Sequence, residues 1–259
     1  MEGNSMRFEL QRADFWKRIS AFLFDIMMIL IVIVSAALIL SAIFKYDKYV
    51  DVVERVENEY AQKYGINPDI TQEEFAALSE EEKAVYYACD EARQEDPRLI
   101  ASYGMLSSLK FAIPSVSILI AYLILEFAVP IFFKNGQTLG KKAFGIGVMH
   151  TNGVRMRGQA HFIRSVIGKC LIEMLVPFYF VMMVLNGRLG PILGLVMIGL
   201  MLVLQIFAVA STKTRSSIHD LISDTVVVDL ASQMVFDTYE DLMAYKTRIH
   251  EEEANKKEY

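Results

Sequence analysis

The sequence has 259 residues, of which 54% are hydrophobic, and a formal net charge of −5. Its mean hydropathy of +0.32 is too apolar for an ordinary soluble domain and excludes an intrinsically disordered chain. An acidic chain lacks the phosphate-neutralising charge of nucleic-acid-binding proteins. Two cysteines cannot form a disulfide framework or a four-ligand zinc site. These exclusions leave an integral membrane protein, with the lipid bilayer as its first partner.

Four apolar blocks are each long enough to cross a bilayer as a helix, which takes roughly 20 apolar residues. They are residues 19–44, 111–133, 166–185 and 189–210. Helix is the expected form because lipid cannot solvate unpaired backbone groups. We therefore predict an all-α polytopic membrane protein with four transmembrane helices. The length of the first block, and Asp25 inside it, argue against a cleaved signal peptide.

The charge of the connecting segments predicts the orientation of these helices. Basic side chains dominate residues 1–18 and 134–165, and the second segment contains no acidic residue. Residues 45–110 instead carry eight Lys and Arg against fifteen Asp and Glu. Positively charged loops stay in the cytoplasm. We therefore expect both termini to be cytoplasmic, residues 45–110 to lie outside, and residues 186–188 to form a tight outer turn.

Residues 45–110 are predicted to form a helical, acidic, extracytoplasmic insert. Thr71-Gln72-Glu73-Glu74 and Ser79-Glu80-Glu81-Glu82 both have the pattern of a helix capping box. We expect a solvated acidic cap, and the alternative is a vestibule whose field concentrates cations. Cys89 lies in this insert and Cys170 lies in a predicted membrane helix, so we expect no bond between them.

Two β-rich runs predict a small cytoplasmic ribbon. Residues 145–150 form the first run, and Thr151-Asn152-Gly153 supplies the turn of a tight hairpin that residues 154–157 would close. Residues 225–229 form the second run. We expect these runs to pair beneath the membrane, and residues 231–259 to form a charged helical tail.

Three motifs resemble those of the RDD family of membrane proteins, which is named for one arginine and two aspartates. Phe15-Trp16-Lys17-Arg18, leading into Ala21-Phe22-Leu23-Phe24-Asp25, is similar to the family's opening. Gly136-Gln137-Thr138-Leu139-Gly140-Lys141-Lys142 is similar to its central motif. In the cytoplasmic segment 211–230, the run from Ser217-Ile218-His219-Asp220 to Asp224-Thr225 is similar to its closing motif.

The resemblance covers most of residues 12–229, apart from the insert. It implies that Arg18, Asp25 and Asp220 are the name-giving residues, and that the protein lies in a bacterial plasma membrane. Transport, including cation/proton exchange, is the activity usually suspected for this family. Ile218 and Asp224 depart from the pattern, because the family usually has glycine there.

Three carboxylates are predicted to lie at one depth in the membrane. Asp25, Glu126 and Glu173 each lie seven residues from the cytoplasmic end of their helix, or about 10 Å at 1.5 Å per residue. Gln205 on the fourth helix lies near the same level. A charge in hydrocarbon costs about 2.5 kcal/mol or more. In a dry layer, clustered acids would hold a proton or a small cation at neutral pH.

Basic residues near this layer leave a structural alternative open. Arg18 is an expected electrostatic partner of the acids. Lys169 lies four residues before Glu173 and would pair with it along an α-helix. Polar side chains can also simply hold membrane helices together. In that case the charges stabilise the bundle and bind no ion.

The closing motif supplies His219, Asp220 and Asp224 as further candidates. Asp220 would cap a short turn or pair with Arg155 or Arg164. His219 would either titrate near neutral pH or play a structural part.

We find no phosphate-binding loop, zinc-protease helix or nucleophile elbow, and we expect no enzyme, cofactor or metal site.

The first functional hypothesis is transport of a small cation coupled to protons through Asp25, Glu126 and Glu173. Four helices are few for a transporter, so a homodimer is expected with it. The second hypothesis is a non-transporting scaffold that binds another protein through the insert or the C-terminal tail. Carboxylates facing a shared polar cavity favour transport, whereas acids that each pair with a base favour the scaffold.

Overall fold

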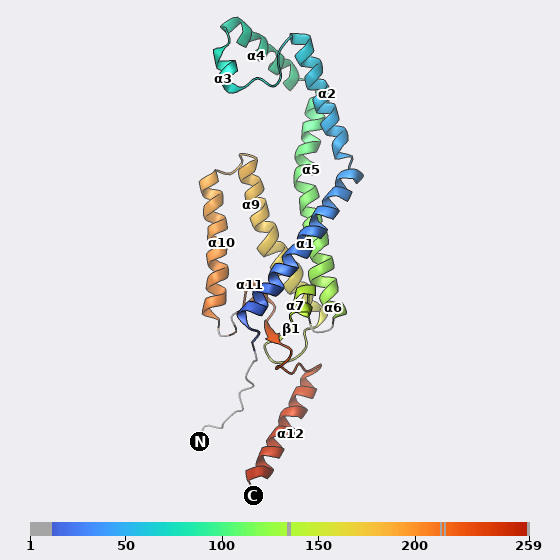
Figure 1. Ribbon diagram of the computed structural model, residues 1–259, viewed down its shortest axis with the longest axis vertical. Helices are drawn as coiled ribbons and strands as arrows, with labels where there is room; N and C mark the ends of the chain where they lie inside the picture. The colour runs from blue at the N-terminus through green and yellow to red at the C-terminus, as the bar shows by residue number, and fades with distance from the viewer. Residues whose placement is uncertain (1–11, 134–135, 213, 215, 258–259) are drawn as a thin grey trace. The chain divides into compact units, whose positions relative to one another are not determined.

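The computed structural model describes residues 12–133, 136–212, 214 and 216–257. Within these ranges, four helices are long and apolar enough to cross a membrane (Figure 1). They are Phe15–Ile43, Pro97–Phe132, Gly158–Leu185 and Pro191–Ser211. The predicted all-α polytopic membrane fold is therefore confirmed. Residues 1–11 and Lys134, which contribute to the predicted basic segments, lie outside the described residues.

Two of these helices extend well beyond the apolar blocks of the sequence. The second begins as α5 (Pro97–Tyr122), rather than at residue 111. The third begins as α8 (Gly158–Phe162), rather than at residue 166. Hydropathy detects only the apolar stretch, whereas the backbone hydrogen bonds of a helix continue into polar sequence. The predicted insert therefore ends inside a helix and not at a loop.

The chain divides into two compact units, and the division falls within α1 (Phe15–Ile43) and α5. The insert unit comprises residues 34–117. The core unit comprises residues 1–33 and 118–259, of which the described part carries all the candidate charges.

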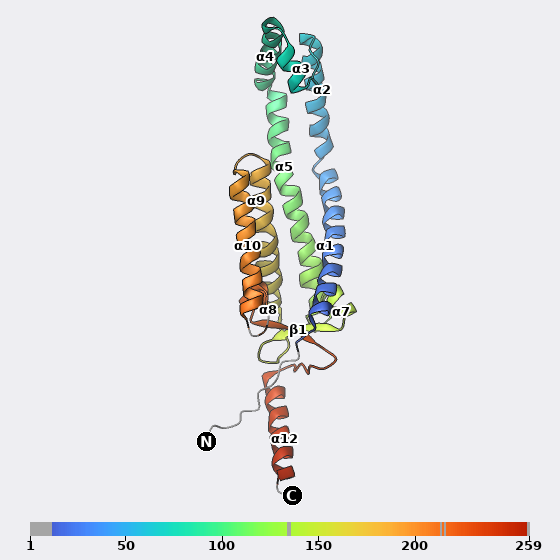
Figure 2. The ribbon, with the colours of Figure 1, turned by 60° about the vertical axis from the view of Figure 1, so that its left-hand side comes forward.

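The insert unit is helical, as predicted. It contains α2 (Tyr46–Tyr64), α3 (Gln72–Ala77) and α4 (Glu80–Gln94), with α2 packed against α4 (Figure 2). Thr71 and Ser79 both form the expected capping boxes. Cys89 on α4 is a fully buried free thiol, and burial raises its pKa. Cys170 is also free, so the expectation that these cysteines do not pair is confirmed.

Ion pairs tie the insert unit together across its helices. Arg93 of α4 lies 2.6 Å from Glu57 of α2. Arg98 on α5 lies 2.9 Å from both Glu59 and Asp96. These contacts join α2 to the helices on either side of residue 96. The acidic sequence of the insert is therefore partly neutralised by its own arginines.

In the core unit, the second and third spans widen into π-helix near their charged residues. Each π segment is followed within two residues by a proline, Pro130 or Pro177. Proline has no N–H to donate, and its ring clashes with an α-helical turn before it. A wider turn relieves that clash, and π turns are common at functional sites. The segments are η1 (Leu123–Ala128), α6 (Val129–Phe132), η2 (Ile163–Leu175) and α9 (Val176–Leu185).

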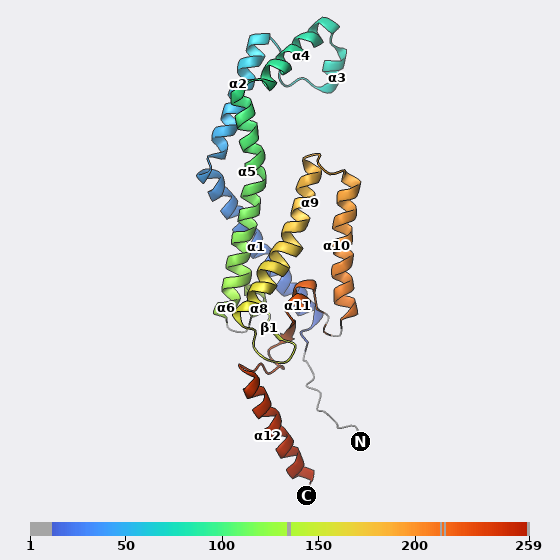
Figure 3. The same cartoon turned by 180° about the vertical axis from the view of Figure 1, so that it is seen from behind.

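The helices α9 and α10 (Pro191–Ser211) run side by side in opposite directions (Figure 3). A tight turn joins them, in which Gly187 has a φ of +66°, as the predicted turn at residues 186–188 requires. Gly194 on α10 lies directly against Val184 on α9: a Cβ there would lie 2.2 Å from a Val184 methyl carbon. The two helices approach closely because this side chain is missing.

A two-stranded antiparallel sheet lies at the end of the core unit opposite the α9–α10 turn (Figure 1). Strand β1 (Ile146–His150) pairs with β2 (Thr225–Asp229), with Val148 opposite Val227. The predicted ribbon is confirmed. The expected hairpin return is reduced to a single bridge between Met149 and Arg155, because Val154 pairs with Phe236, whose carbonyl accepts from the Arg155 N–H.

Both faces of this sheet are covered by apolar side chains, which follow the two-residue period of a strand. One face packs against Ala13 and Ala21 beside α1, and the other packs against Leu230 and Val235. After the sheet, α12 (Tyr239–Lys257) is held by Leu242, which contacts Val154 and Phe236. The short α7 (Leu139–Ala143) and α11 (Ile218–Ile222) precede β1 and β2. These two helices bring the central and closing motifs to the charged end of the spans.

Candidate functional site

A single cavity in the core unit brings the three predicted carboxylates together. Its volume is about 1030 Å³, and residues of α1, η1, η2, α9, α10 and α11 line it. Asp25, Glu126 and Glu173 all line this cavity, together with Asp220. Segments far apart in the sequence therefore place their acids around one space.

Asp25 is held by the beginning of α7. One carboxylate oxygen accepts a 2.5 Å hydrogen bond from the Thr138 hydroxyl, and the other accepts one of 2.8 Å from the Gly140 N–H. The Lys141 ammonium lies 3.9 Å away. Unpaired N–H groups at a helix start favour a carboxylate. Gly140 is needed for this approach, because a Cβ there would lie 2.2 Å from the Ala21 carbonyl oxygen.

Glu126 pairs with Lys169 across two spans, with Nζ 2.6 Å from the carboxylate. This differs from the α-helical pairing of Lys169 with Glu173 that their spacing predicts. The reason is local geometry: Lys169 lies in η2, where turns close over five residues and residues four apart no longer share a face. The lysine side chain therefore reaches the neighbouring helix.

Asp220 and Arg164 form the most deeply buried ion pair of the site, with 2.8 Å between Nε and Oδ1. Of the two arginines named as alternatives, Arg164 is thus the partner, and Arg155 pairs with Asp237 instead. The hydroxyl of Ser217 also donates to Asp220, over 2.9 Å. Burial raises the pKa of Asp220, but the lowering by Arg164 and His219 is larger. The net pKa therefore lies well below its ordinary value.

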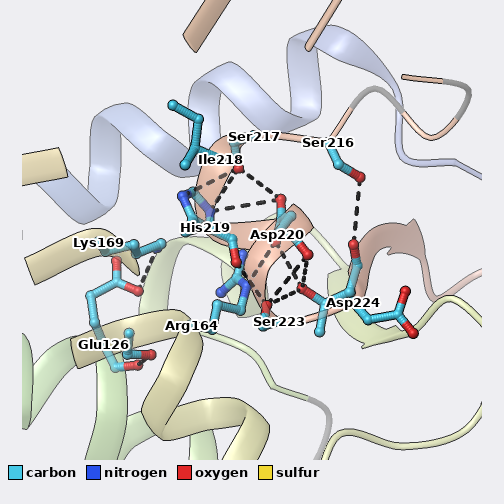
Figure 4. Close-up of polar contacts among 12 residues, drawn as sticks. Glu126, Arg164, Lys169, Ser216, Ser217, Ile218, His219, Asp220, Ser223 and Asp224 are labelled. Atoms are coloured by element: carbon cyan, nitrogen blue, oxygen red, sulfur yellow. Dashed lines mark hydrogen bonds and ion pairs between the residues drawn. The ribbon is translucent and has the colours of Figure 1, made fainter. Parts of the chain in front are cut away.

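His219 connects Glu173 to this ion pair. Figure 4 shows His219 beside Asp220 and Ser217. Its Nδ1 lies 2.8 Å from a Glu173 oxygen, and its Nε2 lies 3.7 Å from Asp220. The amide of Gln205 donates a 3.1 Å hydrogen bond to Glu173. Gly168 in η2 makes room for the histidine, because a Cβ there would lie 2.6 Å from the His219 Cβ.

Asp224 lies outside this network. It adopts a φ of +50°, the conformation for which glycine is usual in the RDD pattern. Its carboxylate accepts a 2.7 Å hydrogen bond from Thr151, and its backbone carbonyl accepts one from the Thr151 N–H. In Figure 4, Asp224 and Glu126 lie on opposite sides of the helix that carries His219 and Asp220. This residue fastens β2 to the turn after β1 and contributes nothing to the cavity.

The geometry is thus a layer of matched charges and not a cluster of bare carboxylates. Of the four carboxylates, Asp25 lies beside Lys141, and Glu126, Asp220 and Glu173 pair with Lys169, Arg164 and His219. Among the described residues, no three His, Cys, Asp or Glu side chains come together as metal ligands do. Arg18 is half-buried and lines the same cavity.

Sequence reasoning did not predict the contacts of three residues that hold the acids in place: Thr138, Lys141 and Ser165. One signal was available. Glu126 and Glu173 each stand in the pattern Glu-x-x-Val-Pro, on two consecutive spans that run in opposite directions. The repeated proline marks both π segments, and hence the positions where side chains leave the α-helical register.

Fold and site together define a polytopic membrane protein with a layer of buried ion pairs at one end of its helices. The chain belongs to the RDD family, whose model matches residues 12–224. The three residues that the family resemblance implies to be name-giving, Arg18, Asp25 and Asp220, all line the same cavity. No curated protein and no solved structure matches the chain.

Proposed function

We propose that this membrane protein exchanges protons for a small cation, and that Glu173 and His219 are the exchanging pair. The observation that carries the proposal is the identity of the bases. Glu126 and Asp220 face Lys169 and Arg164, whereas Glu173 faces an imidazole, whose charge changes near neutral pH. Glu173 is therefore the acid of this layer that faces an imidazole, whereas Asp25 is held by the Thr138 hydroxyl, the Gly140 N–H and the nearby Lys141.

The two protonation states of His219 give the site two charge states. With a protonated imidazole, Glu173 is neutralised and needs no other cation. With a neutral imidazole, the Glu173 carboxylate has no positive partner and can hold a cation. Competition between a proton and a cation for one carboxylate is sufficient for exchange.

The surroundings of His219 set which state dominates. Burial lowers its pKa, Asp220 and Glu173 oppose this, and Arg164 and Lys169 lower the pKa again, so that the net pKa lies below its ordinary value. The imidazole is therefore neutral at neutral pH, and the site is ready for a cation. Acidification protonates His219 and expels the cation. This sequence predicts cation uptake at neutral pH and release into an acidic compartment.

The test uses purified protein in vesicles that contain a pH-sensitive dye. Addition of a monovalent cation outside should drive protons out of vesicles holding wild-type protein. Glu173→Gln and His219→Gln should each abolish this movement. The matched control is Glu80→Gln, an exposed glutamate of the insert unit, which should exchange as the wild type does. Cation-driven proton movement that persists in both site variants would reject the assignment.

A scaffold without transport is the second proposal, favoured by the finding that each acid of the layer has a polar or basic partner. On this reading, the partner protein binds the insert unit or α12. The same variants separate the two proposals. A scaffold predicts that wild-type vesicles show no cation-driven proton movement, and that Glu173→Gln lowers only the thermal stability of the protein.

We further propose a homodimer in a bacterial plasma membrane, with both termini cytoplasmic. The basic residues of the described part of 134–165 support this orientation. Single cysteines introduced at Ser79 and Ser232, in a background without Cys89 and Cys170, test it by labelling of intact cells. Only the first should react with an impermeant thiol reagent. Light scattering in detergent tests the dimer.

A further inference from the structure

The cavity is far larger than a bare metal ion requires. Its volume of about 1030 Å³ lies at the upper end of the range of small-molecule sites, roughly 300–1,000 Å³. Most of its wall is apolar and comes from three spans. The apolar lining includes Ile26, Ile29 and Leu30 on α1, Pro177 on α9, and Ile198 and Leu202 on α10. Such walls suit a ligand with a hydrophobic body.

Among the four carboxylates of the charged layer, Glu173 is the most accessible. The side chain of Glu173 is 22% exposed, whereas those of Glu126 and Asp220 are 4% and 2% exposed. Glu173 is also the acid whose partner is an imidazole and not a permanent cation. When His219 is neutral, Glu173 therefore presents a negative charge to a ligand in the cavity.

The cavity is open toward the side of the helices. Leu30 on α1 and Leu202 on α10 both line it and are themselves 52% and 62% exposed. Both lie within apolar stretches long enough to cross the bilayer. A molecule dissolved in the acyl region can therefore reach the cavity without passing through water.

We propose that the cation of this site is an amphipathic organic cation, with an apolar body between α1 and α10 and its positive group at Glu173. This inference rests on the exchange function proposed above and names its substrate class. Hydrophobic walls and a few placed polar groups are the usual design of such sites. An anionic amphiphile would instead meet the negative charge of Glu173.

The experiment measures binding of tetraphenylphosphonium, a permanent lipophilic cation, to the full chain in nanodiscs of uncharged lipid. Wild-type protein should bind it at alkaline pH and release it on acidification, as His219 protonates. Glu173→Gln should weaken binding by about 30-fold or more, the usual effect of removing one partner of a desolvated charge pair.

Two tryptophan variants of α10 test the apolar wall. Leu202→Trp fills the cavity and should abolish binding of tetraphenylphosphonium. Ile206→Trp is the matched control, because Ile206 is exposed on the same helix and does not line the cavity. It should bind as the wild type does. Equal binding by both variants would overturn the proposal, because the cation would then be dissolved in lipid or held elsewhere.

The vesicle assay distinguishes the failure of this inference from the failure of the exchange function. If sodium or potassium drives proton movement while tetraphenylphosphonium neither binds nor competes, the exchange function stands and the substrate class is wrong. If no cation drives protons but tetraphenylphosphonium binds in the Glu173-dependent manner described, exchange is rejected and the cavity remains an organic-cation site. Binding of an anionic lipid alone, retained in Glu173→Gln, would overturn the inference.

Discussion

The Ser165 hydroxyl donates a 2.5 Å hydrogen bond to the backbone carbonyl of Glu126 on the neighbouring span. In an α-helix, that carbonyl would accept from residue 130, which is a proline and has no N–H. The serine thus supplies, from another helix, a donor that the sequence removed. The Glu126 side chain also pairs with Lys169. The backbone carbonyl and the carboxylate of Glu126 are therefore both bonded to the neighbouring span.

Replacing Ser165 by alanine should leave this buried carbonyl without its interhelical donor. We expect a loss of about 1–3 kcal/mol of folding free energy, seen as a lower midpoint of thermal unfolding in detergent. The control is Ser108→Ala, because the exposed Ser108 hydroxyl only bonds to the Gly104 carbonyl of its own helix. If both variants unfold at the same temperature, the contact is not stabilising.

The Arg164–Asp220 pair should show strong coupling in a double-mutant cycle. Removing one partner leaves a buried, unpaired charge, which costs about 3–5 kcal/mol. We therefore expect Arg164→Gln or Asp220→Asn alone to destabilise the protein strongly, and the double variant to lose much less than their sum. Chemical unfolding of all four proteins measures this. Simple additivity would contradict the finding that these groups neutralise each other.

Gly140 should tolerate no side chain. An added Cβ would lie 2.2 Å from the Ala21 carbonyl oxygen and 2.9 Å from Asp25, and overpacking of this kind costs about 1–3 kcal/mol. Gly199 is the matched control, since a Cβ there meets nothing within 4 Å, and alanine favours a helix interior by about 1 kcal/mol. Thermal unfolding should therefore shift downward for Gly140→Ala and upward for Gly199→Ala.

Lys141 should make the stability of the protein depend on pH above neutrality. Burial, with the nearby charge of Lys169, lowers its pKa from 10.5 to about 7. Between these two values the unfolded chain binds a proton that the folded protein does not, so stability rises with pH across this window. We expect the unfolding midpoint to rise above neutral pH, and Lys141→Met to remove that part of the rise.

The adjacent Lys142 provides the control for this titration, because it is exposed and lies over the Phe133 ring. Lys142→Met should keep the wild-type pH profile. Identical profiles for Lys141→Met and Lys142→Met would show that the buried lysine is not the titrating group.

The sequence by itself determined the four spans, the capping boxes at Thr71 and Ser79, and the pairing of the two β-rich runs. The spans follow from a comparison of apolar side chains with lipid, the capping boxes from residues close in sequence, and the two runs from their local β-rich composition. The depth of the acids also followed from sequence, because a helix converts residue number directly into height. Asp25, Glu126 and Glu173 were therefore recognisable as one layer before their partners were known.

The tertiary structure decided which base pairs with each acid. Lys169 pairs with Glu126 and not with the predicted Glu173, because a π-helix changes the angle between successive residues. A hydropathy pattern does not reveal that change. Of the two predicted arginines, Arg164 is the partner of Asp220, because it lies on the span against which α11 packs. His219 reached Glu173 because Gly168 leaves space on the opposite helix. Charge partners depend on distances between separate helices, and only packing fixes those distances.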